Sequence, residues 1–233
     1  MELKGKTAIA TGSGKGIGEG IAIEPRWPVA LAILAVLILL AALPGRVRLL
    51  PSWVPYAIAI GLLLPMAAVR LTGGKPRWLR IERMTTLLFV LLAEGITLTT
   101  LAYLIRGMLD RPGDVSGLQL LATSIAAWVT NVLAFSLAYW RIDRGGPEAR
   151  ANDAGARPDW LFPQTGAPEE APPGWRPTYV DYLFLGFSTA TAFSPTDALP
   201  LTSRAKMLMM LESAVSLTTL VVVAARAINM LGS

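Results

Sequence analysis

Residues 84–105 read MTTLLFVLLAEGITLTTLAYLI, and this stretch decides the class of fold. Its only charged residue is Glu94, and the remainder consists of uncharged, mostly apolar residues. A helix of about 22 residues spans the roughly 30 Å of hydrocarbon in a bilayer, because each residue adds about 1.5 Å. The stretch therefore predicts a transmembrane helix.

Other apolar stretches lie on both sides of this one. Residues 28–43 carry no charge and are apolar on every face, which favours a helix surrounded by lipid. Residues 53–69 and 118–140 predict two further spans, a shorter apolar run covers 179–193, and a last span starts at 206 or 207 and ends at 225. The chain is thus predicted to be all-α, a polytopic transmembrane helix bundle with five or six membrane segments.

The composition agrees with a chain that is surrounded partly by lipid and partly by water. Hydrophobic residues make up 53% of the chain and charged residues only 16%, whereas soluble domains carry about 25% charged residues. The net charge is +5, and the basic residues flank the apolar spans. This placement predicts the lipid bilayer as partner and argues against nucleic acid. Because the chain has no Cys and no His, thiolate and imidazole chemistry are excluded, and we expect no metal, no cofactor and no enzymatic activity.

Lys and Arg also predict the orientation. They gather in the N-terminal part and in the linker 70–83, which the positive-inside rule places in the cytoplasm of a bacterial cell whose plasma membrane the chain would cross. If residues 179–199 cross the membrane, the chain has six spans and its C-terminal end lies inside. If they dip in and return, it has five spans and that end lies outside. The charge pattern favours six.

The chain divides into segments of different character. Residues 1–26 form a polar, Gly-rich N-terminal segment, and residues 27–140 hold the first four spans. Residues 141–178 are rich in Pro, Gly and Ala, which predicts a solvated loop. Residues 179–233 combine the short apolar run, a proline-bearing turn and the final span.

The N-terminal segment contains LKGKTAIATGSGKGIG at residues 3–18. This stretch resembles the start of short-chain dehydrogenases/reductases, with their Thr-Gly-x3-Gly-x-Gly arrangement. The resemblance implies a pyrophosphate of NAD(P) at Gly12, Gly16 and Gly18. It covers only the start of the chain, no second βα unit follows, and no Tyr is followed four residues later by Lys. The sequence therefore predicts that this segment does not bind the cofactor.

The last segment contains FSTATAFSPTDALPLT at residues 187–202, followed by a helical stretch that includes Leu211 and Glu212. It resembles the pore module of two-span potassium channels, in which a short helix, a filter and a Pro-x-Thr turn precede the inner helix. An uncharacterised family of bacterial membrane proteins shares this order of spans. The resemblance implies a homo-oligomer with a filter region, which here comprises Thr191, Phe193, Ser194, Pro195, Thr196 and Asp197.

The filter region departs from the channel pattern at its centre. Phe193-Ser194-Pro195-Thr196 stands where the channels have Val-Gly-Tyr-Gly. The glycines of the filter permit left-handed dihedral angles, whereas Pro195 fixes φ near −65° and restricts Ser194. We therefore expect no potassium filter, and the tetramer that the resemblance implies loses its basis.

Polar residues within the apolar stretches are the candidate functional residues. They are Glu94, Asn131, Asp181 and Glu212. A carboxylate in hydrocarbon costs several kcal/mol unless it is protonated, paired or facing water. The pattern thus indicates a proton relay or ion path, or else carboxyls that are neutral or bonded to nearby hydroxyls such as Ser216 and so hold helices together. Gly95, beside Glu94, is a position at which a neighbouring helix could approach closely.

Three functions follow from these observations. The first is an ion-channel-like or transport-like membrane protein that lacks a potassium filter. The second is a structural or assembly protein of the membrane with no permeation path. The third is a membrane-tethered reductase, which the N-terminal resemblance implies. Flux that depends on Glu94 and Glu212 would separate the first from the others.

Overall fold

The computed structural model describes residues 24–42, 51, 53–110, 117–152, 157–192 and 198–231. Within these residues four helices are long and apolar enough to cross a membrane. They are α2 (Val54–Leu71), α3 (Pro76–Asp110), α4 (Gly117–Ile142) and α8 (Ser203–Leu231). Helix α1 (Trp27–Ala42) is apolar but shorter, with 16 residues. The predicted all-α bundle with membrane-spanning helices is confirmed.

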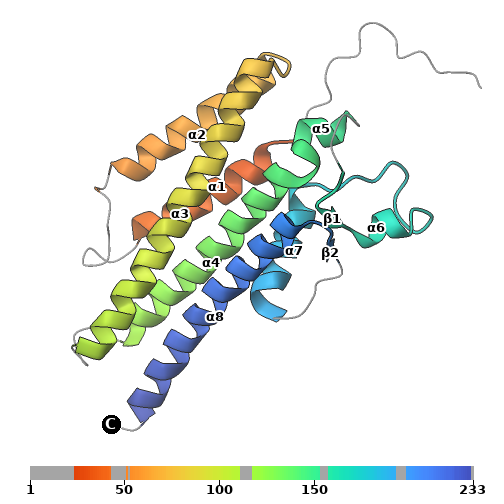
Figure 1. Cartoon of the computed structure of the whole chain (residues 1–233). Helices are drawn as coiled ribbons and strands as arrows, with labels where there is room; N and C mark the ends of the chain where they lie inside the picture. Colours follow the sequence, from red (N-terminus) through yellow and green to blue (C-terminus); the bar gives the residue numbers. More distant parts are fainter. Residues whose placement is uncertain are drawn as a thin grey trace, which may run out of the picture.

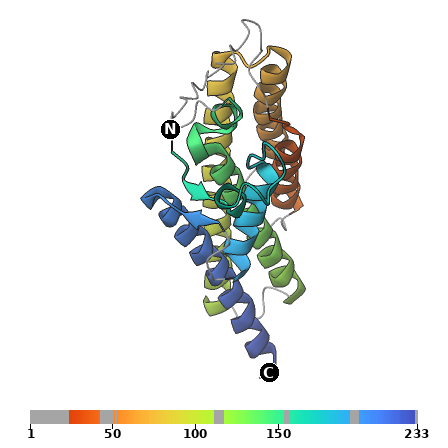
Figure 2. The same cartoon turned by 90° about the vertical axis from the view of Figure 1, so that its right-hand side faces the viewer.

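The four long helices run along the long axis of the molecule (Figure 1). Helix α4 is central, because it contacts α1, α3, α7 and α8. We call the end at which α3 begins and α4 ends the connector end, since the short elements gather there. The opposite end, at which α3 ends and α4 begins, is the far end, and the C-terminal end of α8 points toward it (Figures 1 and 2).

The outer surface of the bundle is apolar, as lipid contact requires. Ile38, Ile60, Leu91 and Leu220 are each more than half exposed, with fractions of 66%, 64%, 71% and 53%. The buried residues of α3 and α4 include Thr86, Thr97, Thr130 and Asn131. A soluble protein rarely exposes large apolar patches. The distribution therefore fits a bundle whose surface is in hydrocarbon.

Helix α3 starts eight residues before the span predicted from the apolar stretch. Pro76 lies at the first helical position, where its missing N–H costs nothing. Residues 77–83 extend the helix and include three arginines, Leu79 and Glu82, which are good helix formers. A helix of 35 residues is about 52 Å long, which exceeds the hydrocarbon thickness. Most of the linker predicted at 70–83 is thus the first two turns of α3.

The segment predicted to be a solvated loop is partly ordered and anchored in the core. It contains the 3-10 turn η1 (Asp143–Gly145), α5 (Pro147–Ala151), strand β1 (Trp160–Leu161) and α6 (Pro163–Gly166). Asp143, Trp160 and Phe162 are buried. The Trp160 ring lies against the Tyr139 ring of α4, with centroids 4.8 Å apart. Buried aromatic residues therefore fix this segment against the bundle, although its Pro, Gly and Ala content predicted a solvated loop.

Helix α7 (Tyr179–Ala192) packs against α4 and α8. Strand β2 (Leu199–Pro200), which follows α7, pairs antiparallel with β1. The Asp159 carbonyl accepts the N–H of Leu201 at 2.7 Å, and the Asp159 side chain accepts from Thr202 Oγ1 at 2.6 Å. The pairing of β1 with β2 therefore brings the residues before α6 next to the residues before α8. A helix of 14 residues covers only about 21 Å, and α7 is not among the four candidate spans of the described residues. The choice between five and six membrane segments stays a prediction.

Candidate functional site

Three helices bring polar side chains together inside the bundle. Asn131 of α4 donates its Nδ2 hydrogens to the Glu212 carbonyl at 3.1 Å and to Ser216 Oγ at 2.9 Å. The Tyr139 hydroxyl, two turns further along α4, is hydrogen-bonded to the Glu212 carboxyl. Both Asn131 and Glu212 are completely buried, at 0% exposure. Glu94 of α3, Asn131 and Tyr139 of α4, and Glu212 of α8 form what we call the carboxyl cluster.

Glu94 of α3 belongs to the cluster through its electrostatic interaction with Glu212 and with Tyr139. Both Glu94 carboxyl oxygens are enclosed and have no hydrogen-bond partner in the described part of the chain, and the same holds for Glu212 Oε1. A buried acceptor without a donor is costly. The site thus has oxygen atoms that a proton or a water molecule would stabilise.

A close helix contact frames the cluster. A Cβ atom added at Gly186 of α7 would lie 2.5 Å from Ser136 Oγ and 3.2 Å from Glu212 Oε1. Only a glycine lets α7 pack this near to α4 and α8. Gly95 does not have the expected role, since an added Cβ there would meet nothing within 4 Å.

The other predicted site residues lie elsewhere. Asp181 caps the start of α7, where its carboxylate accepts from the backbone N–H of Thr178 at 2.7 Å and from its hydroxyl at 2.9 Å. This is half of a capping box, a structural role. Thr191 donates to the Phe187 carbonyl and lines an apolar groove of about 320 Å³ between α4 and α8. Phe193, Ser194, Pro195, Thr196, Asp197 and the glycines Gly12, Gly16 and Gly18 lie outside the described residues.

No relative supplies a function for this arrangement. Comparisons with models of protein families, with curated proteins and with solved structures found no match to the chain. The resemblances to potassium channels and to short-chain dehydrogenases therefore remain predictions. In the described ranges, no group of three or more acidic side chains is placed to hold a metal ion.

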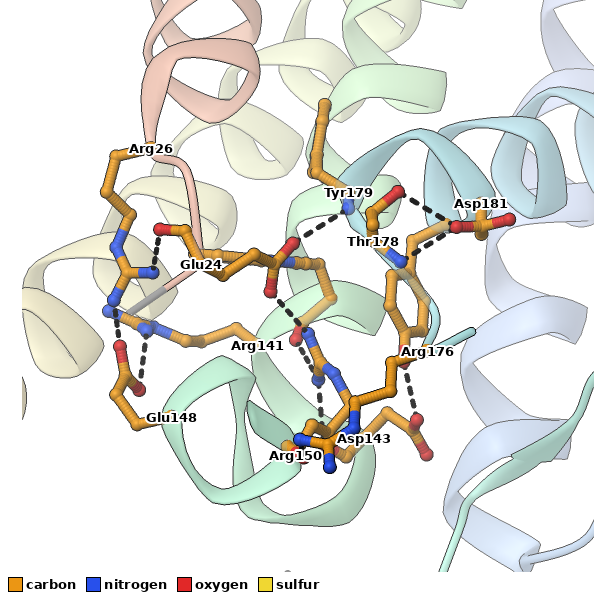
Figure 3. A network of polar contacts seen from close by, with 12 residues as sticks. Glu24, Arg26, Arg141, Asp143, Glu148, Arg150, Arg176, Thr178, Tyr179 and Asp181 are labelled. Atoms are coloured by element: carbon orange, nitrogen blue, oxygen red, sulfur yellow. Dashed lines mark hydrogen bonds and ion pairs between the residues drawn. The ribbon is translucent and has the colours of Figure 1, made fainter. Parts of the chain in front are cut away.

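A second polar group, which the sequence did not indicate, lies at the connector end. It consists of three arginines and three glutamates, which we call the end network: Glu24, Arg26, Glu82, Arg141, Glu148 and Arg150. Figure 3 labels these residues apart from Glu82. Glu82 of α3 is its centre. Its carboxylate receives Arg26 Nε at 2.9 Å and Arg141 Nη2 at 3.2 Å. All three side chains are at most 7% exposed.

Two further glutamates, Glu148 and Glu24, pair with the arginines of the end network. Arg26 and Arg141 both reach Glu148 of α5, as Figure 3 shows. Glu24 accepts from Trp140 Nε1 and from the Tyr179 backbone N–H, each at 3.0 Å, and pairs with Arg150 at 3.4 Å. The end network thus ties the residues before α1 to α3, α4, α5 and α7.

Asp143 links this network to the returning chain. It accepts from the Tyr182 hydroxyl at 2.5 Å and from the Asp159 backbone N–H at 2.7 Å. Tyr182 lies on α7, outside the four candidate spans. Burial raises the pKa of its hydroxyl well above the usual value, so Tyr182 stays protonated and keeps donating to Asp143.

Proposed function

We propose that this chain is a membrane transport protein in which the carboxyl cluster takes up and releases a proton. One observation carries the proposal. Glu94 and Glu212 come from different helices, interact electrostatically, and present enclosed oxygens without a donor in the described residues. Two interacting carboxyls in a low-dielectric site do not both ionise readily, so they favour sharing or exchanging a proton.

The surroundings of the cluster support proton exchange more than ion passage. Tyr139 and Asn131 hold the Glu212 side chain and the adjacent backbone in place. A hydroxyl such as that of Tyr139 can keep a carboxyl oriented in both of its protonation states, because it can donate or accept a hydrogen bond. Intramembrane acidic residues of this kind mark proton relays in pumps and transporters.

The proposal is tested by proton flux in vesicles. We expect purified protein in liposomes to dissipate a pH gradient, reported by an enclosed pH-sensitive dye, faster than protein-free liposomes. Glu94→Gln and Glu212→Gln keep the shape of the side chain but cannot exchange the proton. Each should reduce the protein-dependent rate more than about tenfold.

Glu169→Gln is the matched control, because Glu169 is an exposed carboxylate at the connector end and should leave the rate unchanged. If the wild-type liposomes behave like empty ones with protons and with a panel of alkali cations, the transport proposal fails. Stable association with another membrane protein would then favour the structural role.

The proposal includes a bacterial plasma membrane with the connector end in the cytoplasm. Exposed cations surround the turn between α2 and α3 at this end: Arg70, Lys75, Arg77, Arg80 and Arg83. Such a cluster near short connections favours the cytoplasmic side. The proposal adopts the five-segment alternative, in which the chain returns to the connector end after α7 and the C-terminal end of α8 lies outside.

Single cysteines test this orientation, because the chain has none of its own. We expect Leu118→Cys, at the far end, to react with a membrane-impermeant maleimide on intact bacterial cells. Glu169→Cys should react only after the cells are permeabilised. Both native side chains are exposed, so burial does not limit labelling. The opposite pattern would invert the topology.

A further inference from the structure

A small cavity lies between α1, α3 and α4. Four threonines contribute to its lining: Thr97 and Thr100 of α3, and Thr123 and Thr130 of α4. Its volume is about 10 Å³, close to the space that one water molecule occupies by this measure. None of the four threonines is more than 2% exposed.

Two of these threonines behave differently from others in the bundle. Threonines in helices usually donate back to the carbonyl four residues earlier. Thr86, Thr99 and Thr219 do so, at 2.7, 2.7 and 2.9 Å. Thr97 and Thr100 do not, and their enclosed Oγ1 atoms have no partner in the described residues. An unsatisfied hydroxyl within a membrane bundle is costly, so these two need a partner in the cavity.

Two residues of the cavity lining are neighbours in sequence of residues in the carboxyl cluster. Thr97 follows Glu94 by three residues, which places it about 4.5 Å further along the axis and near the same helix face. Thr130 precedes Asn131 on α4. The direction from Glu94 to Thr100 runs toward the far end, because α3 ends there.

We propose that this threonine cavity holds one internal water molecule, which exchanges protons with Glu94 on the side of the cluster that faces the far end. The inference rests on the proposed function and adds the route by which the proton leaves. Two to four polar partners hold a typical buried water, and the cavity offers four hydroxyls.

The exchange conserves protons and the water molecule. The Glu94 carboxyl gives its proton to the water oxygen, and the water gives one of its own protons to solvent water that enters from the far end. Leu104 and Leu120 are buried toward that end, at 1% and 2% exposure. The second transfer therefore requires solvent water to pass this buried apolar part of the bundle.

The test uses Thr97→Val and Thr100→Val, singly and together, in the full chain. Valine keeps the shape of threonine and removes the hydroxyl. We expect the double variant to lose most of the proton flux in liposomes, more than about tenfold. The matched control is Thr99→Val, because Thr99 is exposed and donates to the Gly95 carbonyl. This variant should retain the wild-type rate.

A second measurement reports the water directly. The infrared carbonyl band of protonated Glu94, assigned by its loss in Glu94→Gln, should shift to higher frequency in Thr97→Val/Thr100→Val as the carboxyl loses its hydrogen-bonding water. Wild-type flux that persists in the double variant, or a band that does not move, overturns the inference while the proposed function stands. Absence of flux in the wild type instead overturns the proposed function.

Discussion

Replacing Glu82 with alanine is expected to lower the free energy of unfolding by about 3–5 kcal/mol. Glu82 is 1% exposed and its carboxylate faces Arg26 on one side and Arg141 on the other. Without it, two buried guanidinium groups with the same charge lie beside each other. The remaining Glu148 contacts both arginines but cannot neutralise two charges. Removing one partner of a buried ion pair is costly because the other charge stays buried and uncompensated.

The loss should appear in reversible unfolding by sodium dodecyl sulfate in mixed micelles, followed by circular dichroism. Arg77→Ala is the matched control, since Arg77 is an exposed charged residue of the same first turns of α3. Its effect should stay within about 0.5 kcal/mol. Equal unfolding curves for Glu82→Ala and the wild type would show that the end network does not stabilise the bundle.

Gly186→Ala is expected to destabilise the bundle by about 1–3 kcal/mol, the usual range for overpacking, and to abolish proton flux. The added methyl group would lie 2.5 Å from Ser136 Oγ and 3.2 Å from Glu212 Oε1. The Ser136 hydroxyl cannot easily rotate away, because it donates to the Val132 carbonyl at 2.6 Å, and that carbonyl would itself be 3.2 Å from the new atom. Helix α7 must therefore move away from α4, and the Glu212 carboxyl moves with the disturbed contact.

Gly95→Ala separates this steric effect from helix propensity. Gly95 is also a helical glycine close to the cluster, but an added Cβ there meets nothing within 4 Å. Alanine is favoured over glycine in a helix by roughly 1 kcal/mol, so this variant should be at least as stable as the wild type and should conduct normally. If both alanine variants conduct equally, α7 does not need its close packing for transport.

The spans were predictable because lipid requires uninterrupted apolar helices. Residues 84–105 and 118–140 correspond to parts of α3 and α4. The capping role of Asp181 could also have been recognised, since Thr178-x-x-Asp181 is a local pattern at a helix start. The failure at 141–178 has a physical cause. The Pro, Gly and Ala content describes the segment as a whole, whereas two single residues, Trp160 and Phe162, are buried and hold it against the bundle.

The contacts between helices could not be predicted in the same way. Asn131 meets Ser216 across 85 positions, and Arg26 meets Glu82 across 56. Such pairings depend on the position of each helix along its axis and on its rotation relative to its neighbours. Neither can be inferred from a single sequence. Glu94, Asn131 and Glu212 were identified as buried polar residues, but Tyr139 and Gly186 were missed because aromatic and small residues are common in membrane helices.

The pairing of β1 with β2 has a consequence for how the protein is made. Asp159 is bonded to Thr202 and paired with Arg204, and both partners are translated later than α7. While α7 emerges from the ribosome, neither its closing strand nor Glu212 exists, and Tyr139 has no carboxyl to bind. Helix α7 can already meet its earlier partners, since Tyr179 bonds Glu24 and Tyr182 bonds Asp143. The carboxyl cluster, in contrast, cannot be complete before α8 has been inserted.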